Sequence, residues 1–262
     1  MRNLHREIHP SSASIAGVIP ARWGSTRFPG KSLAPICGKP LIQWVMERAR
    51  QARSLSSLWV ATDDERIRSA VLDLGGQVVM TRSDHPSGTD RIAEAVKNSD
   101  AEVVINIQGD EPLIDPVLID LLGTTLAEDP SWDMATAACP ISDPADLANP
   151  SVVKVVWGAE GQALYFSRSI IPFVRDPEER EDAAPVLHWR HIGIYAYRRT
   201  FLEKLVKAPV CRLERAEKLE QLRALYLGCR MKVLPAESFG WGVDTPDDIA
   251  KAEEMLKRLG LA

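Results

Sequence analysis

Three basic residues follow directly on the first apolar stretch of the chain. The stretch Ile15–Pro20 predicts a β-strand, and it runs into a loop that carries Arg22, Arg27 and Lys31. Small residues in the same loop let backbone N–H groups approach a ligand closely. Several cations on a flexible backbone after a strand are suited to holding a polyphosphate. The loop is therefore predicted to bind phosphate groups.

A Walker A loop is the first alternative, because Gly30-Lys31-Ser32 matches the end of that motif. Five residues separate Gly24 from Gly30 here, whereas the motif requires four. Pro35 also prevents a helix from starting at Lys31, so no helix N-terminus faces the phosphates as in a P-loop. A surface loop whose charges are simply solvated is a second alternative, which composition alone leaves open.

Two aspartates lie where a metal ion could meet nucleotide phosphates. Asp110 ends the buried run V-V-I-N-I-Q-G-D, and Asp244 follows Val243 in a similar short motif. A carboxylate at the carboxyl end of a strand is well placed to hold Mg²⁺ against phosphates. Helix capping is the alternative for both, and for Asp244 it is compatible with metal binding. Asp63 and Asp64 are expected to cap the helix that follows them.

Length and composition fit one large α/β domain, or one domain with a smaller subdomain, because 262 residues can bury a sizeable core. The net charge of −4 gives no general attraction to nucleic acid or to an acidic membrane. No apolar run approaches the ~18 residues of a membrane span. Four scattered cysteines indicate reduced thiols in the cytoplasm. Residues 1–14 lack the apolar region of a signal peptide and are predicted to form a disordered tail.

Short apolar runs alternate with helical patterns, which predicts a mostly parallel sheet covered by helices. Ligands of such sheets lie beyond the carboxyl ends of the strands, so the loops that follow the strands should converge on one crevice. The predicted strands are Ile15–Pro20, Leu58–Thr62, Val78–Met80, Glu102–Ile107 and Met134–Ala138, and the predicted helices lie near Pro40–Ala52, Asp64–Leu74, Thr89–Lys97 and Pro116–Ala127.

The pattern becomes β-rich after Asn149-Pro150, which predicts an inserted subdomain over residues 151–227. Residues 15–150 and 228–262 then form the nucleotide-binding core. The later predicted strands are Val152–Val156, Ala163–Phe166, Ile192–Tyr197 and Met231–Leu234, and the later helices are Thr200–Lys207, Leu213–Leu227 and Pro246–Leu259.

Eight sequence blocks, in order, resemble the 3-deoxy-manno-octulosonate cytidylyltransferase (CMP-Kdo synthetase) family of sugar-activating nucleotidyltransferases. The resemblance covers nearly everything from Ile15 onward, and it implies a Rossmann-like core, Mg²⁺, CTP and the acid sugar Kdo as substrates, and a homodimer. The blocks are the opening loop, V-A-T-D-D (Val60 to Asp64), D-H-P-S-G-T-D-R (Asp84 to Arg91), N-I-Q-G-D-E-P (Asn106 to Pro112), A-L-Y-F-S-R-S (Ala163 to Ser169), R-H-I-G-I-Y-A-Y (Arg190 to Tyr197), L-E-Q-L-R (Leu219 to Arg223) and G-V-D-T-P-D-D (Gly242 to Asp248).

The resemblance also implies a role for individual residues. Asp110 and Asp244 would hold the metal and, with Arg22 and Lys31, form the catalytic group. The nucleotide would be bound by Pro20, Ala21, Arg22, Arg27, Lys31, Ser87, Gly88, Thr89, Arg91 and Gln108, and Kdo by Gln108, Arg168, His191, Tyr195, Glu220 and Gln221.

Local patterns support some of these roles and leave alternatives for others. Ser87 begins a predicted helix, so a plain N-cap is nearly as good an interpretation as a base-reading turn. His191 and Tyr195 are four apart on a predicted strand and should share one face. The predicted helix Leu213–Leu227 places Glu217, Glu220 and Gln221 on a common face, for which solvation is the usual explanation. By resemblance, the exposed-looking apolar residues Phe166, Ile170 and Phe173 suggest the dimer interface.

The predicted reaction is attack of the anomeric hydroxyl of Kdo on the α-phosphorus of CTP, which gives CMP-Kdo for lipopolysaccharide synthesis and releases pyrophosphate. No side chain is an evident general base, and metal-assisted loss of the hydroxyl proton, helped by Asp110, is the preferred account. One alternative is a cytidylyltransferase for 8-amino-Kdo or sialic acid. Another is a non-catalytic nucleotide-sugar sensor on the same fold.

Overall fold

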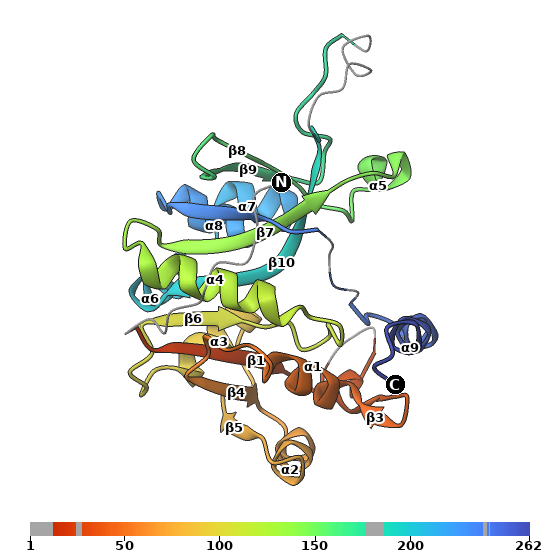
Figure 1. Cartoon of the computed structure of the whole chain (residues 1–262). Coiled ribbons are helices and arrows are strands. Elements are labelled where there is room, and N and C mark those ends of the chain that lie inside the picture. The colour runs from red at the N-terminus through yellow and green to blue at the C-terminus, as the bar shows by residue number, and fades with distance from the viewer. Residues whose placement is uncertain (1–12, 25–27, 177–185, 238–239, 241) are drawn as a thin grey trace.

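The computed structural model describes residues 13–24, 28–176, 186–237, 240 and 242–262, and its centre is a nine-stranded sheet (Figure 1). Seven strands follow the order β11-β7-β10-β6-β1-β4-β5, and β8 and β9 extend the sheet beside β10. Strand β10 is antiparallel to both of its neighbours on this path, β6 and β7. The other neighbours on the path are parallel, which confirms the predicted α/β class. The strands are β1 (Ile15–Ala21), β4 (Ser57–Thr62), β5 (Gln77–Met80), β6 (Val103–Asn106), β7 (Met134–Pro140), β8 (Lys154–Trp157), β9 (Ala163–Ser167), β10 (Trp189–Arg198) and β11 (Met231–Pro235), with β2 (Pro35–Ile36) and β3 (Lys39–Pro40) forming a separate hairpin.

Helices cover both faces of the sheet, because the strands are apolar on both sides. Along β1, Ile15 and Ile19 belong to one apolar cluster, whereas Ala16 and Val18 belong to another. Successive side chains of a strand point to opposite faces, so this alternation requires a layer on each side. The helical elements are η1 (Lys31–Leu33), α1 (Leu41–Ala49), α2 (Glu65–Asp73), α3 (Gly88–Ala95), α4 (Pro116–Glu128), α5 (Pro144–Ala148), α6 (Arg199–Lys207), α7 (Arg212–Glu217), α8 (Gln221–Tyr226) and α9 (Asp248–Arg258).

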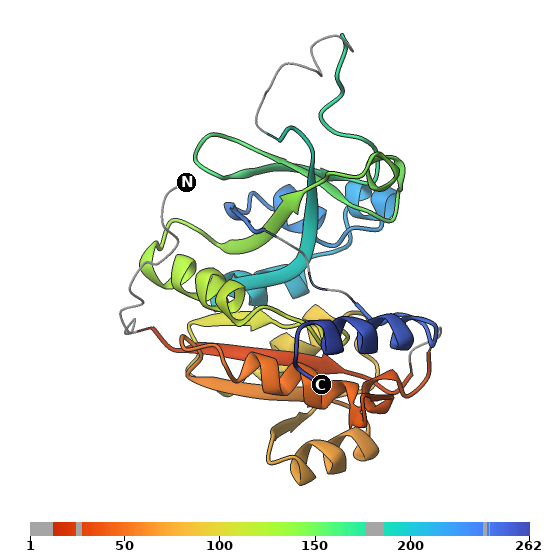
Figure 2. The same ribbon diagram turned by 45° about the vertical axis from the view of Figure 1, so that its right-hand side comes forward.

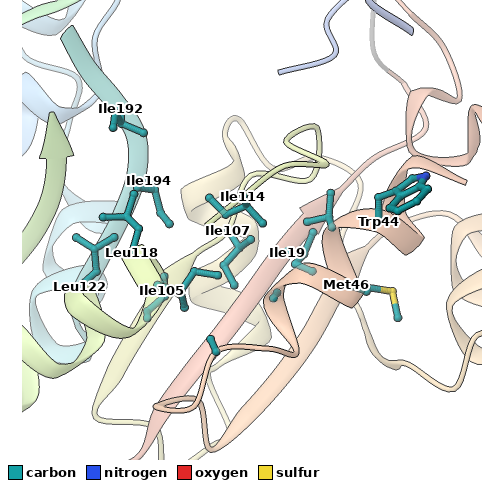
Figure 3. Packing of buried hydrophobic residues seen from close by; sticks show 14 of the residues in the cluster. Ile19, Trp44, Met46, Ile105, Ile107, Ile114, Leu118, Leu122, Ile192 and Ile194 are labelled. Atoms are coloured by element: carbon teal, nitrogen blue, oxygen red, sulfur yellow. The ribbon is translucent and has the colours of Figure 1, made fainter. Parts of the chain in front are cut away.

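The first of the two apolar clusters packs α1 and α4 against β1, β6 and β10. Figure 3 shows Leu118 and Leu122 of α4 lying beside Ile105 of β6 and Ile194 of β10. All four side chains belong to the same buried cluster, and Leu122, Ile105 and Ile194 are fully buried. Apolar burial of this extent stabilises each such side chain by about 1.5–3 kcal/mol. This packing fixes the positions of β6 and β1 relative to α4.

Most predicted elements are confirmed within a few residues, but the segment after residue 150 differs from expectation. Strand β10 lies inside the central sheet, between β6 and β7, so part of the range 151–227 is built into the core sheet. The division into two units stays a prediction. At the other end, Ser14 was assigned to the tail, yet its carbonyl accepts backbone hydrogen bonds from Glu102 and Val103. Residues 1–12 lie outside the described part of the chain.

Two expectations are wrong, one about a helix and one about the exposure of a side chain. The single helix expected over Leu213–Leu227 is two helices, α7 and α8, because Lys218 adopts a left-handed conformation with φ of 54°. The helical face shared by Glu217 and Gln221 therefore does not exist. Phe166 was expected to be exposed but is fully buried in the second apolar cluster, because it faces inward from β9. Ile170 and Phe173 are exposed, as expected.

Candidate active site

A pocket of about 310 Å³ lies where the carboxyl ends of β1 and β6 meet, a volume at the lower end of those that hold small ligands. Both strands are parallel and adjacent, so the loops that follow them open on the same edge of the sheet. Within the described residues, none of the helices has the length and apolarity needed to cross a membrane. The lining residues are Pro20, Ala21, Arg22, Lys31, Ser32, His85, Pro86, Ser87, Gly88, Arg91, Gln108, Gly109, Asp110 and Asp244.

The basic loop after β1 is closed by its own backbone. The N–H of Gly30 donates to the carbonyl of Trp23 at 3.0 Å, and Gly30 has a φ of 71° that favours glycine. A Cβ on Gly30 would lie 2.9 Å from the Trp23 ring, so a side chain there would displace the indole. The next residue is Lys31, which η1 turns into the pocket. Arg27 lies outside the described residues.

The Ser87-Gly88-Thr89 turn starts α3 at the side of the pocket. The Ser87 hydroxyl accepts the N–H of Asp90 at 3.2 Å and donates to the Asp90 carboxylate at 2.7 Å, so Ser87 is the helix N-cap. Ser87 and Gly88 both line the pocket. The N-terminus of α3, with its partial positive charge, therefore faces the pocket beside Pro20.

Arg91 and His85 flank this turn and are both held by acids. Arg91 is almost fully buried and forms an ion pair with Asp63 at 3.4 Å. The side chain of His85 contacts Glu94, and hydrogen bonds from His85 and the Arg82 amide lower the pKa of Glu94 against the opposing effect of burial. The helix-capping role expected near Asp63 belongs to Asp64, whose carboxylate accepts the N–H of Arg66. His85 was not among the predicted site residues, although it stands in the block that carries Ser87.

Gly109 lets the loop after β6 pass close to the end of β1. A Cβ at this position would lie 2.7 Å from the Pro20 carbonyl oxygen, a clash with rigid backbone. The close approach of the two backbones fixes the positions of the neighbouring residues, Gln108 and Asp110. The Gln108 amide donates to the Gly193 carbonyl at 2.7 Å, which ties the pocket to the irregular part of β10. Asp110 then points toward Lys31.

One ammonium group lies between the two predicted metal ligands. Lys31 Nζ is 2.7 Å from Asp110 Oδ2 and 3.4 Å from Asp244 Oδ1. The two aspartates are distant in sequence and are joined through the backbone, since Val243 N–H donates to the Asp110 carbonyl at 2.8 Å. A positive charge is thus already shared by both carboxylates. These hard oxygen donors fit Mg²⁺. Among the described residues, no group of three or more His, Cys, Asp or Glu side chains is arranged to hold a metal ion, so substrate or water would supply the other ligands.

Glu111 follows Asp110 and is a half-buried residue with a buried carboxylate oxygen, which the sequence did not single out. Within the described residues, its Oε2 has no hydrogen-bond partner. Burial, together with the charge of Asp110, raises the pKa of Glu111 to about 7. The side chain lies against Gly240, where a Cβ would come within 2.7 Å of the Glu111 carboxylate.

His191 and Tyr195 form a second group with neighbouring rings beside the pocket, on β10. Their ring centroids are 5.3 Å apart, so the two side chains share a face as predicted, despite the irregularity between Ile192 and Tyr195. His191 Nε2 is 2.9 Å from the Thr136 hydroxyl, and burial lowers the pKa of its imidazole to about 3. The ring is therefore neutral at pH 7. Burial also raises the pKa of Tyr195.

A hydrogen bond connects the start of α3 to Glu220, the residue that precedes α8. Thr89, buried at the start of α3, donates its hydroxyl to the carboxylate of Glu220. Gln221 is buried as the first residue of α8. Thr89, Glu220 and Gln221 thus lie behind the pocket wall and do not line it.

Arg168 is another predicted site residue that does not line the pocket. Its guanidinium donates to the carbonyls of Glu217 at 2.6 Å and Pro150 at 2.9 Å. Its backbone N–H donates to the Glu217 carboxylate at 3.0 Å. Arg168 thus joins α7 to β9 and the segment before β8 in this chain, and its contact with a sugar stays a prediction.

Comparison with known proteins identifies the family. A sequence profile of cytidylyltransferases matches residues 16–233. The chain belongs to the cytidylyltransferase family. The structure of a family member, a CMP:2-keto-3-deoxy-manno-octonic acid synthetase complexed with CTP, superposes with a TM-score of 0.89 at 43% identity, covering 94% of this chain and 100% of that one.

Two curated cytidylyltransferases are similar over nearly their whole length. A 3-deoxy-manno-octulosonate cytidylyltransferase of Geobacter sulfurreducens is 50% identical over 249 residues, which cover 93% of this chain and 100% of the relative. An 8-amino-3,8-dideoxy-manno-octulosonate cytidylyltransferase of Shewanella amazonensis is 50% identical over 248 residues, which cover 93% and 99%. A 4-diphosphocytidyl-2C-methyl-D-erythritol synthase of Anaerococcus prevotii, at 14% identity and a TM-score of 0.63, shares the fold alone.

Proposed function

We propose that this cytidylyltransferase transfers CMP from CTP to the anomeric hydroxyl of Kdo, which yields CMP-Kdo and pyrophosphate. The observation that carries the proposal is the shared position of Lys31 between Asp110 and Asp244, in a pocket walled by the α3 N-terminus. Cations, a helix N-terminus and two acids in one pocket fit a metal-bound triphosphate. The solved relative complexed with CTP supports the nucleotide assignment.

In this proposal the basic residues of the pocket bind the phosphates, and the acidic residues bind the metal. Arg22 and Lys31 neutralise negative charge on the phosphates and on the departing pyrophosphate. Asp110 and Asp244 would hold Mg²⁺, which when bound supplies charge neutralisation and lowers the pKa of the attacking hydroxyl. The Ser87-Gly88 turn would present its backbone groups to the pyrimidine edge, since the Ser87 hydroxyl is engaged by Asp90.

The sugar is assigned to the side of the pocket beyond Gln108. Gln108 reaches both the pocket and β10, and the neutral ring of His191 and the hydroxyl of Tyr195 lie on the same strand. Glu220 and Gln221 follow on the far side of Thr89. Neutral hydrogen-bonding groups and the half-buried carboxylate of Glu220 suit the hydroxyls of an acid sugar, whose own carboxylate would meet the cations of the pocket.

Pyrophosphate release tests the reaction and its substrates together. The enzyme is assayed with CTP and Mg²⁺ in parallel reactions that contain Kdo, 8-amino-Kdo or sialic acid. Mass spectrometry identifies the product of each reaction. We expect CMP-Kdo as the preferred product. Preference for 8-amino-Kdo would make the Shewanella relative the better guide, and tight CTP binding without release from any acid sugar would indicate a nucleotide-sugar sensor. Equal rates with CTP, UTP and dTTP would refute base recognition by the Ser87 turn.

We also propose that the enzyme works as a homodimer in the cytoplasm. The support for association is the exposure of large apolar side chains in β9 and in the segment that leads to β10, where Phe173 is 83% exposed and Leu164 and Leu187 are 61% and 50% exposed. Because contiguous exposed apolar surface is typical of contact sites, we propose that these side chains meet a second copy of the chain. The cytoplasmic assignment is supported by four free cysteines, since reduced thiols are the rule in that compartment.

A further inference from the structure

The turn that carries Asp244 is tied to the following helix by a single carboxylate oxygen. Oδ2 of Asp248, the first residue of α9, accepts the backbone N–H of Asp244 at 3.0 Å. The same oxygen accepts the N–H and the hydroxyl of Thr245, each at 2.9 Å. Asp248 N–H in turn donates to the Thr245 carbonyl at 3.1 Å. Asp244 and Thr245 thus both donate to Asp248, and Thr245 also accepts from it.

Helix α9 is itself fixed to the body of the protein. Figure 2 shows it lying beside α1 and the loop region that carries β3. Glu253 accepts the backbone N–H of Cys37 at 2.8 Å, next to the β2–β3 hairpin. Ala252 and Leu256 are fully buried in the cluster that also contains Ile36 and Trp44. Because the helix is anchored at these points, Asp248 is a fixed reference for the turn in front of it.

The other end of the turn is held by the partner acid. Val243 is fully buried, and its N–H donates to the carbonyl of Asp110. The backbone of Asp244 therefore lies between two attachments, one to the Asp110 loop and one to α9. Two carboxylates this close repel each other, so the backbone must resist their separation whenever no cation lies between them.

We propose that Asp248 is a positioning residue that holds Asp244 opposite Asp110, so that both carboxylates can share one divalent cation. The inference rests on the proposed function. Asp248 is not among the residues that line the pocket, and it acts through the three hydrogen bonds to the turn. Partners of this kind typically change metal affinity or activity by about 10–100-fold when they are removed.

The adjacent Asp247 provides a matched control. It is exposed, it precedes α9 by one residue, and its side chain makes no capping hydrogen bond. Asp247→Ala therefore removes the same charge from the same helix terminus and leaves the turn intact. Asp248→Asn keeps an acceptor oxygen without the charge, so it separates hydrogen bonding from electrostatics and serves where Asp248→Ala does not fold.

Amide hydrogen exchange of the substrate-free protein is the first measurement. Asp248→Ala should speed exchange at the Asp244 and Thr245 amides by about tenfold or more, because both lose their acceptor. The second measurement is Mn²⁺ binding in the presence of CTP, followed by electron paramagnetic resonance, and the Mg²⁺ concentration at half-maximal turnover. We expect both to weaken about 10–100-fold in Asp248→Ala, with the CTP KM at saturating Mg²⁺ little changed. Asp248→Asn should recover most of the affinity, and Asp247→Ala should match wild type.

Wild-type exchange in a folded Asp248→Ala protein would overturn the proposal, as would faster exchange with unchanged Mn²⁺ and Mg²⁺ dependence. An equal effect of Asp247→Ala would assign the result to charge alone and would also overturn it. Failure of the wild-type protein to release pyrophosphate would instead refute the proposed function. That outcome is separate, because exchange and Mn²⁺ binding are measured without turnover.

Discussion

Replacing Lys31 by methionine should have opposite effects on metal binding and on turnover. In the substrate-free protein, the ammonium touches both carboxylates that the metal would use. A divalent cation must therefore displace Lys31 before it can occupy the position between Asp110 and Asp244. Methionine keeps most of the length and apolar volume of the lysine stem and removes only the competing charge.

The magnitude follows from the distances. Since Nζ is 2.7 Å from one carboxylate and 3.4 Å from the other, the two acids lie within about 6 Å of each other. Two unit charges at that separation repel by about 0.7 kcal/mol in water and about 3 kcal/mol at an effective dielectric constant of ~20. Asp244 is 47% exposed, so solvent screening places the effect near the lower figure.

A change of about 1 kcal/mol corresponds to about fivefold in affinity. We expect Lys31→Met to bind Mn²⁺ about fivefold more tightly than wild type in the absence of nucleotide, measured by titration with electron paramagnetic resonance. With CTP and Kdo present, the same variant should lose about 10²–10³ in turnover, because a fixed charge is missing where the phosphates develop negative charge. Pyrophosphate release measures this second effect.

Lys39→Met is the matched control. Lys39 pairs with Glu47 at 2.8 Å and does not line the pocket, so its loss should leave both measurements unchanged. Unchanged or weaker Mn²⁺ binding in a folded Lys31→Met protein would refute the competition between lysine and metal. Near-normal turnover would refute the contribution of Lys31 to the phosphates.

Three further predictions concern other parts of the molecule. Because burial raises the pKa of Glu111 to about 7, the folded state keeps a proton that the unfolded state releases above about pH 4.5, and the free energy of unfolding should fall between these pH values. Glu111→Gln should therefore gain stability relative to wild type from pH 4.5 to 7 and hold that gain above pH 7, which thermal unfolding at pH 4, 6 and 8 can show; a constant difference would contradict it. Gln221→Ala should raise the KM for Kdo about 5- to 150-fold, the equivalent of ~1–3 kcal/mol, with CTP affinity unchanged by calorimetry. Weaker CTP binding with normal Kdo binding would show that the sugar has been assigned to the wrong side of the pocket. Phe173→Ser should shift the protein from dimer to monomer in sedimentation velocity, whereas a dimer that persists would exclude this surface from the interface.

The residues of the nucleotide side could be predicted from the sequence because their arrangement follows from local rules. The strand at Ile15–Pro20, the glycine at position 109 and the cap at Ser87 each have a signal within a few residues. Parallel strands then bring their carboxyl ends to one edge, so Lys31 and Asp110 had to lie near each other.

Tertiary structure decided the features that depend on distant contacts. The sequence pattern alone could not show that β10 enters the sheet between β6 and β7, because strand order depends on which edges are covered. Nor could it show that Lys218 interrupts a helix, since a left-handed residue there is compensated by contacts of Glu217 with Ser167 and Arg168. The meeting of Asp110 and Asp244 through Val243 spans more than half of the chain, and Asp248 acquires its role only once α9 is packed in place. Amino-acid types therefore determined which groups could do the chemistry, and long-range packing determined which of them face one another.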